Sequence, residues 1–408
     1  MENSIMSKSQ SNLLYLYIFL TFFIGRSVRS WLHFDFPPTS IIGGINYLGL
    51  PVLLALFFSI RNKCLYKEEW WIIVFSLITI VVGKFLNGSA NIVNIVTNCF
   101  EPLMLCCVLR NADITIIRKC GLILVYFFIV ECLVAIYEAS TRSVLFASLK
   151  DETLIGMQLW TMRAYSLHGH PLANGAIVSL LSLSFIITNN FSKVVKLMLV
   201  VLGFYSILCF NNRGSCFILG GCAFLYISYY IILGKADLLQ KVFFIAILVV
   251  AMCYVWDIVC NSYIGSRIFN SEMSMNDEST QGHLAALSFL NMLDLPGWLF
   301  GVPADLIYGS YMKKIHAVAV ESSVVLYILV YGLIYSIAYY VFLFRFILTF
   351  QTGKIMRCLI ALMVMLTLNT CNLIFDGNPY ISLLVLCLYC FKTNYTNEVI
   401  NNSTYVQR

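Results

Sequence analysis

The chain has 408 residues, of which 60% are hydrophobic and only 11% are charged, and its formal net charge is +6 at pH 7. A soluble globular domain carries about 25% charged residues, so this composition excludes a water-soluble fold and favours lipid as the solvent. The basic residues lie in short segments between apolar runs, as topology signals do, which argues against nucleic acid as a partner.

Apolar runs long enough to cross a bilayer follow one another along the whole chain. The sequence therefore predicts an all-α integral membrane protein, a single polytopic domain over residues 1–408 with about twelve spanning helices of roughly 20 residues each. We expect the first run to be a retained helix rather than a cleaved signal, because Arg26 and Arg29 follow it and no small-residue cleavage site does. The predicted spans are 11–25, 41–60, 70–86, 92–109, 120–137, 172–188, 195–210, 215–233, 242–258, 318–344, 358–375 and 381–392.

Lysine and arginine residues set the predicted orientation. With the N-terminus in the cytoplasm, the cytoplasmic segments hold sixteen of them and the longer outer segments hold ten. This bias predicts an inner-membrane protein with both termini in the cytoplasm. Two segments, 138–171 and 259–317, are then long periplasmic loops, and the larger one separates the predicted spans at 242–258 and 318–344.

The predicted chemistry faces away from the cytoplasm. Cytoplasmic loops are short, and the sequence contains neither a Gly-rich phosphate loop nor a dinucleotide fingerprint. The 15 cysteines lie mostly inside apolar runs, where cysteine acts as a small hydrophobic residue, and no cluster with metal-ligand spacing is visible. We therefore predict neither a cofactor nor a bound metal.

Basic residues mark the outer face. Arg163 comes shortly before a His170-Pro171 pair that leads into a helix. Arg213 sits in a four-residue link between two apolar runs, and Arg267 lies early in the large loop. Arginine suits phosphate, because its planar fork of donors matches two phosphate oxygens. The alternative for each arginine is contact with lipid headgroups, which the shortness of its link makes least plausible for Arg213. All five histidines fall on this side: His33, His168, His170, His283 and His316.

Acidic residues occur in two settings. Glu321 follows His316 at the start of a predicted helix, so both are candidate bases at the outer face. Glu101 and Glu131 lie inside apolar runs, where an acid is either functional or a hydrogen-bonded group facing the bundle interior.

Two stretches of the large loop are expected to form surface elements. Residues 283–293 are amphipathic enough to lie on the membrane surface. Residues 295–303 contain two Pro and two Gly, and we interpret them as a turn-rich segment.

Four motifs, in this order, resemble the bacterial O-antigen polymerase and O-antigen ligase superfamily, and together they cover about residues 160–335. They are Arg163 with His170-Pro171; Asn212-Arg213-Gly214 between two helices; Leu299-Phe300-Gly301-Val302 at the end of the large loop; and a polar start, Glu321-Ser322, continuing to Tyr331-Gly332-Leu333-Ile334.

The resemblance implies a GT-C-like fold and a metal-independent glycosyltransferase. Its substrate would be an undecaprenyl-diphosphate-linked oligosaccharide in the membrane lipid, and its partners a chain-length regulator and a flippase. Arg213 and Arg163 would stabilise the departing diphosphate with help from Arg267, while His316 and Glu321, then His170, are candidates for the base near the acceptor hydroxyl.

The chain departs from the family pattern at two places. Asn212 stands where the family usually has Ser, although the Arg-Gly pair after it is kept. The loop position that often carries an arginine falls within residues 279–283, which contain none, so either His283 or Arg267 must take that role.

Three functions fit this pattern. An O-antigen polymerase would join lipid-linked repeat units, and an O-antigen ligase would transfer the polymer to lipid A-core. A flippase or exporter would place charges within its helices along a pathway and often show repeat symmetry, whereas here the predicted helices hold few charges and no repeat is visible. We favour the polymerase, because of the His-Pro element and the Glu321-Ser322 start.

Overall fold

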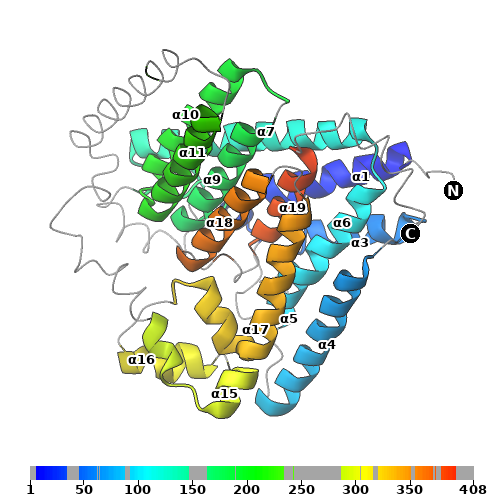
Figure 1. Ribbon diagram of the computed structural model, residues 1–408, viewed down its shortest axis with the longest axis vertical. Helices are drawn as coiled ribbons and strands as arrows, with labels where there is room; N and C mark the ends of the chain where they lie inside the picture. Colours follow the sequence, from blue (N-terminus) through cyan, green and yellow to red (C-terminus); the bar gives the residue numbers. More distant parts are fainter. Residues whose placement is uncertain are drawn as a thin grey trace.

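The computed structural model describes residues 6–34, 46–61, 63, 65–87, 92–146, 163–188, 190–233, 242, 286–303, 305–315, 320–350, 354–370, 373 and 378–391. All regular secondary structure in these ranges is helical, with no strand among them (Figure 1). Residues 243–258 of the predicted span at 242–258 lie outside the described residues, as do residues 147–162, 259–285, 304, 316 and 317 of the two long loops.

The helices follow the predicted apolar runs closely. In chain order they are α1 (Lys8–Ile18), the π-helical turn η1 (Phe19–Phe23), α2 (Arg26–Trp31), α3 (Gly49–Ser59), α4 (Lys67–Asn87), α5 (Ile92–Ile95), η2 (Val96–Phe100), α6 (Glu101–Arg110), α7 (Ile114–Thr141), α9 (Pro171–Ile187), α10 (Lys193–Cys209), α11 (Arg213–Leu233), α15 (Leu295–Phe300), η5 (Leu306–Tyr311), α16 (Met312–Ile315), α17 (Ser323–Phe350), α18 (Lys354–Thr370) and α19 (Tyr380–Cys390).

Four of these segments are long and apolar enough to cross a membrane: Lys67–Leu86, Ile92–Arg110, Ile114–Thr141 and Ser323–Phe350. Shorter apolar helices accompany them, among them α3, α9 and α19. The all-helical, apolar character that the composition predicts is thus confirmed for the described residues, while the number of spans stays a prediction.

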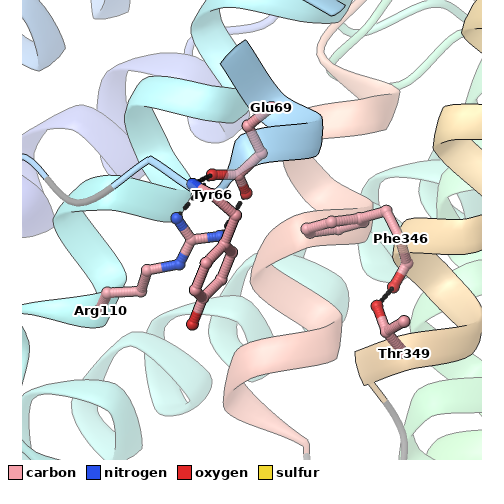
Figure 2. Close-up of polar contacts among 5 residues, drawn as sticks. All are labelled: Tyr66, Glu69, Arg110, Phe346 and Thr349. Atoms are coloured by element: carbon pink, nitrogen blue, oxygen red, sulfur yellow. Dashed lines mark hydrogen bonds and ion pairs between the residues drawn. The ribbon is translucent and has the colours of Figure 1, made fainter. Parts of the chain in front are cut away.

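Contacts between helix termini collect at two ends of the bundle. We call one of them the Arg110 end. There the two terminal nitrogens of the Arg110 guanidinium donate to the Glu69 carboxylate, and the guanidinium carbon lies 4.1 Å from the centre of the Tyr66 ring (Figure 2). The Glu69 carboxylate also accepts the Tyr66 N–H at 2.8 Å, which satisfies a backbone donor at the start of α4. Gln10 donates to the Ser59 carbonyl at 2.9 Å, so the start of α1 lies beside the end of α3.

The opposite helix termini meet at what we call the Arg213 end. Here the Ala164 N–H donates to the Cys209 carbonyl at 3.1 Å, and the Leu373 N–H donates to the Ser323 hydroxyl at 2.8 Å. Helices that alternate between two ends in this way are the arrangement that the predicted topology requires. Which side of a membrane each end faces stays a prediction.

Helix α9 lies at the centre of one half of the bundle and packs against α7, α10, α11, α18 and α19 (Figure 1). Nearly all of its residues are buried, and many are Ala, Gly or Ser. Small side chains let helix backbones approach closely in a membrane protein, where packing replaces the hydrophobic effect between helices. Gly203 of α10 illustrates this, because a Cβ there would collide with the Ser182 hydroxyl of α9.

Helix α17 is kinked at Gly332, whose φ of 80° and ψ of 168° are not helical. The carbonyl of Leu329, which would bond the next turn in a continuous helix, instead accepts the Val302 N–H at 2.7 Å. Gly301 also has a positive φ of 79° and faces Val330 of the kink. The loop element that follows α15 therefore supplies the hydrogen bond that the kink removes. Figure 1 shows α15 beside α17.

One expectation about the large loop was wrong. Residues 295–300 form helix α15 rather than a turn, because the Asp294 side chain accepts the Gly297 N–H at 2.9 Å and caps it. Pro296 lies in the first turn of α15 and Gly301 directly follows its last residue, and these residue types are favoured at those positions of a helix.

Candidate functional site

A short non-helical segment, residues 163–170, carries two of the predicted site residues into the Arg213 end. Ser166 has a φ of 45° and Gly169 a φ of 73°, so the backbone turns sharply in the left-handed region. Such a conformation costs free energy and persists only where its surroundings hold it. Most of the support comes from two acids of α7.

Glu138 is the principal support. Its carboxylate accepts the N–H groups of Leu145, Tyr165 and Ser166 at 2.9, 2.7 and 2.9 Å. One carboxylate has about four acceptor positions, so it can hold three backbone donors at once. Glu138 therefore ties the end of α7 to the segment that follows Arg163.

Glu131 lies two turns earlier on α7 and faces the same segment. Its carboxylate accepts the Leu167 N–H at 3.3 Å, and its carbonyl accepts the Ser166 hydroxyl at 3.1 Å. Of the two alternatives for the intramembrane acids, the structure places Glu131 as a hydrogen-bonded group inside the bundle. Glu101 has the same character, since it accepts the hydroxyl of Tyr17 at 2.8 Å and the amide of Asn46 at 3.1 Å.

Gly25 and the first turn of α2 pack against the other side of this segment. The Ser27 N–H donates to the Leu167 carbonyl at 3.1 Å. The fit is close, because a Cβ on Gly25 would collide with that carbonyl and a Cβ on Gly169 would lie 2.7 Å from the Ser27 hydroxyl. These contacts place Arg26, the residue between Gly25 and Ser27, beside the turn that leads to His170.

The link between α10 and α11 completes the junction. The Ala164–Cys209 hydrogen bond joins the residue after Arg163 to the end of α10, three residues before Asn212. Asn212 caps α11, because its side-chain oxygen accepts the Ser215 N–H at 3.1 Å while its amide donates to the Leu172 carbonyl at 3.2 Å. An Asn side chain has both an acceptor and donors, so it can make both bonds at once.

Arg213 is the first residue of α11 and is half-buried. Gly214, which follows it, faces Thr370 at the end of α18, and a Cβ added to Gly214 would lie 3.3 Å from the Thr370 Cβ. The space beside Gly214 is therefore filled by α18. The segments that carry Arg163 and Arg213 therefore both belong to this junction.

Glu321 lies at the same end of the bundle, two residues before the start of α17. The hydroxyl of Ser322, the next residue, donates to Asn369 at 3.3 Å, and Asn369 precedes the Thr370 that contacts Gly214. Three other predicted site residues, Arg267, His283 and His316, lie outside the described residues.

The histidines of this segment are held neutral at physiological pH. Burial and the nearby Arg29 lower the pKa of His168 to about 3. Desolvation, followed by the charges of Arg163 and Arg26, lowers the pKa of His170 to about 4. His170 is exposed, so contact with water limits the effect of desolvation on its pKa, and the two guanidinium charges are the stronger cause. Positive charge at this junction therefore comes from arginine, and His170 is better suited to hydrogen bonding than to general-base catalysis at neutral pH.

Two members of this assembly do not stand out in the sequence. Glu138 falls at the start of a predicted loop, although its spacing of seven residues from Glu131 puts both acids on one face of a helix. In the sequence, Arg26 stands out only as a basic residue that follows the first predicted span. Its place beside the 167–169 turn depends on a contact between segments about 140 residues apart, which no local pattern reveals.

Among the described residues, no group of three His, Cys, Asp or Glu side chains could hold a metal ion, and the metal-independent reaction stays a prediction. One groove lined by described residues has a volume of about 600 Å³, runs along α17 from Val324 to Thr349 and is almost wholly apolar. The residues that line it include none of the predicted site residues. Comparison with known proteins found no family model and no curated protein that matches this chain.

Proposed function

We propose that this protein is an O-antigen polymerase, which joins undecaprenyl-diphosphate-linked oligosaccharide units at the periplasmic face of the bacterial inner membrane. The observation that carries the proposal is that the segments carrying Arg163 and Arg213 meet at one junction of an apolar helical bundle, through the Ala164–Cys209 hydrogen bond and the bond from Asn212 to Leu172. Two arginines from separate motifs can there face the headgroup of a lipid whose tail lies in the bilayer.

The proposed reaction is a glycosyl transfer. A hydroxyl oxygen of the acceptor sugar forms a bond to the anomeric carbon of the donor chain, and the bond from that carbon to the diphosphate oxygen breaks. The electron pair leaves with undecaprenyl diphosphate, and the hydroxyl proton passes to a base. Charge grows on the departing oxygen, so preorganised guanidinium groups stabilise the transition state more than the ground state.

Glu321 is the favoured base among the described candidates. It stands at the Arg213 end, linked to Asn369 through Ser322, whereas the depressed pKa of His170 makes that ring a weak proton acceptor at neutral pH. His316 remains part of the proposal as an alternative base, and Arg267 and His283 as further substrate-binding residues.

The finer architecture belongs to the same proposal. It comprises about twelve spanning helices, a GT-C-like arrangement, cytoplasmic termini and periplasmic loops at 138–171 and 259–317. The alternation of helix termini between the Arg110 and Arg213 ends supports it. The membrane lipid, a chain-length regulator and a flippase are the proposed partners.

A gene deletion complemented with variants tests the proposal, with the surface polysaccharide examined on a gel. Loss of long polymer with one repeat unit retained on the core supports a polymerase. Complete loss from the core, with lipid-linked polymer accumulating, would instead identify a ligase. Accumulation of single units facing the cytoplasm would identify a flippase and overturn the proposal.

A further inference from the structure

We propose that Arg26 is a further phosphate-binding residue of this site, which holds the diphosphate of the lipid-linked substrate together with Arg163 beside His170. This inference rests on the proposed function and deepens it. It adds Gly25 and helix α2 to a site whose motifs all lie within residues 160–335.

The backbone around Arg26 is fixed to the site on both sides. Ser27 donates its N–H to the Leu167 carbonyl at 3.1 Å, and Gly25 lies so close to the same carbonyl that no side chain fits between them. Gly169 packs against the Ser27 hydroxyl in turn, one residue before His170. Arg26 is therefore carried by the same rigid junction as the turn, whereas an arginine that only follows a span would need no such fit.

The charge distribution favours an anion at this place. Arg26 and Arg163 both act on the His170 ring, and their like charges lower its pKa. Within the part of the chain that the structure describes, no carboxylate pairs with Arg26, and the acids nearest the turn, Glu131 and Glu138, accept backbone N–H groups from it. An anion bound beside both guanidinium groups would reduce the repulsion between their like charges.

A diphosphate matches this arrangement better than a single phosphate. It carries two phosphoryl groups, and each guanidinium can bind one of them with its two-pronged fork of donors. Arg163 comes from the segment attached to α10, and Arg26 comes from α2. Arg29 differs from Arg26, because its guanidinium lies 5.0 Å from the centre of the Tyr47 ring and its charge acts on His168.

Binding of farnesyl diphosphate to the purified full-length protein in detergent tests this role, with farnesyl monophosphate, farnesol and phosphatidylglycerol as comparison ligands. We expect Arg26→Ala to weaken farnesyl diphosphate binding about tenfold or more, as loss of a charged hydrogen-bond donor does. Arg26→Lys should recover part of it, because lysine keeps the charge and loses the fork. Lys84→Ala is the matched control, since Lys84 is a basic residue on the same predicted side, at the far end of α4.

The outcomes separate this inference from the proposed function. If Arg213→Ala and Arg163→Ala weaken binding while Arg26→Ala does not, Arg26 has no part in the site although the proposed function stands. If Arg26→Ala weakens only phosphatidylglycerol binding, Arg26 contacts lipid headgroups and the inference is wrong. If no arginine variant weakens binding of farnesyl diphosphate, the proposed function itself fails. Should Arg26→Ala not accumulate, the pair Arg26→Gln and Arg26→Lys decides, and equal binding by both overturns the inference.

Discussion

Gly301 and Gly332 face each other across the contact between the large loop and helix α17. Each has a positive φ, 79° and 80°, and each lies against the backbone of the other's segment: Gly301 against Val330, and Gly332 against Leu299. Two separate motifs of the sequence thus form one structural joint. The joint fixes the end of the loop to the kink, with the Val302–Leu329 hydrogen bond beside it.

Alanine at either glycine of this joint should disrupt folding. A Cβ at Gly332 would collide with the Leu299 carbonyl, and a ψ of 168° at positive φ is a region that essentially only glycine adopts. We expect Gly332→Ala and Gly301→Ala each to cost about 3 kcal/mol or more, because backbone strain of about 1–3 kcal/mol adds to the clash. The measurement is thermal unfolding of the detergent-solubilised protein. Gly221→Ala is the control, since no atom lies within 4 Å of its added Cβ, and an equal loss there would refute the explanation.

Glu138→Ala should destabilise the turn that carries Arg163. The change leaves the N–H groups of Leu145, Tyr165 and Ser166 without their acceptor, and each unsatisfied buried donor costs about 1–3 kcal/mol. Thermal unfolding should show a clear fall for this variant. Glu68→Ala should show almost none, because its ion pair with Arg345, at 3.6 Å, is exposed on both sides and such pairs contribute about 0–1 kcal/mol. Equal stability of the two variants would mean that Glu138 does not hold the turn.

His168 makes stability depend on pH in a defined window. Its pKa is about 3 in the folded protein and about 6.5 in the unfolded chain, so between these values the unfolded chain binds more protons. The free energy of unfolding therefore falls as the pH drops below 6.5, by roughly 1 kcal/mol at pH 5.5 from this residue. Melting temperatures measured from pH 4.5 to 7.5 should decline less steeply for His168→Gln than for the wild type. An equal slope in His168→Gln and in the wild type would contradict this role of His168.

The sequence allowed the helices to be predicted closely where apolar character and helix length coincide. Helix α9 runs from Pro171 to Ile187, against a predicted span of 172–188. Helix α7 extends well beyond its predicted span of 120–137, because Asp113 caps its start with a bond to the Ile116 N–H and charged residues continue the helix past the apolar run. A prediction based only on apolar residues therefore made this span too short and left Glu138 outside it.

The candidate site was predictable to the extent that its residues stand in local motifs. Arg163 and Arg213 were proposed in this way, and the structure brings their segments together. Arg26 and Glu138 were not, because their positions beside the 163–170 segment come from packing between segments distant in the chain. A carboxylate that holds a turn from another helix looks, in the sequence, like any acid at the edge of a span.

Arg213→Ala should abolish detectable polymer while the amount of protein in the membrane stays normal. Arg213 is half-buried at the first residue of α11, and the Asn212 cap and the fit of Gly214 against Thr370 hold its backbone in place without using its side chain. Removing one preorganised donor at a site of developing charge costs about 10²–10³ in rate. Arg213→Lys should retain a weak remnant, because lysine keeps the charge but not the bidentate fork.

Polymer length on a gel, with membrane protein quantified by immunoblot, measures both variants of Arg213. Lys193→Ala is the control, since Lys193 is exposed at the Arg110 end, far from the junction. Normal polymer in Arg213→Ala would return Arg213 to lipid-headgroup contact and remove the central support for the proposed function. An alanine variant that fails to accumulate, while the lysine variant accumulates and makes normal polymer, would show that Arg213 needs only its charge. The two-pronged recognition of phosphate would then have to come from Arg163 and Arg267.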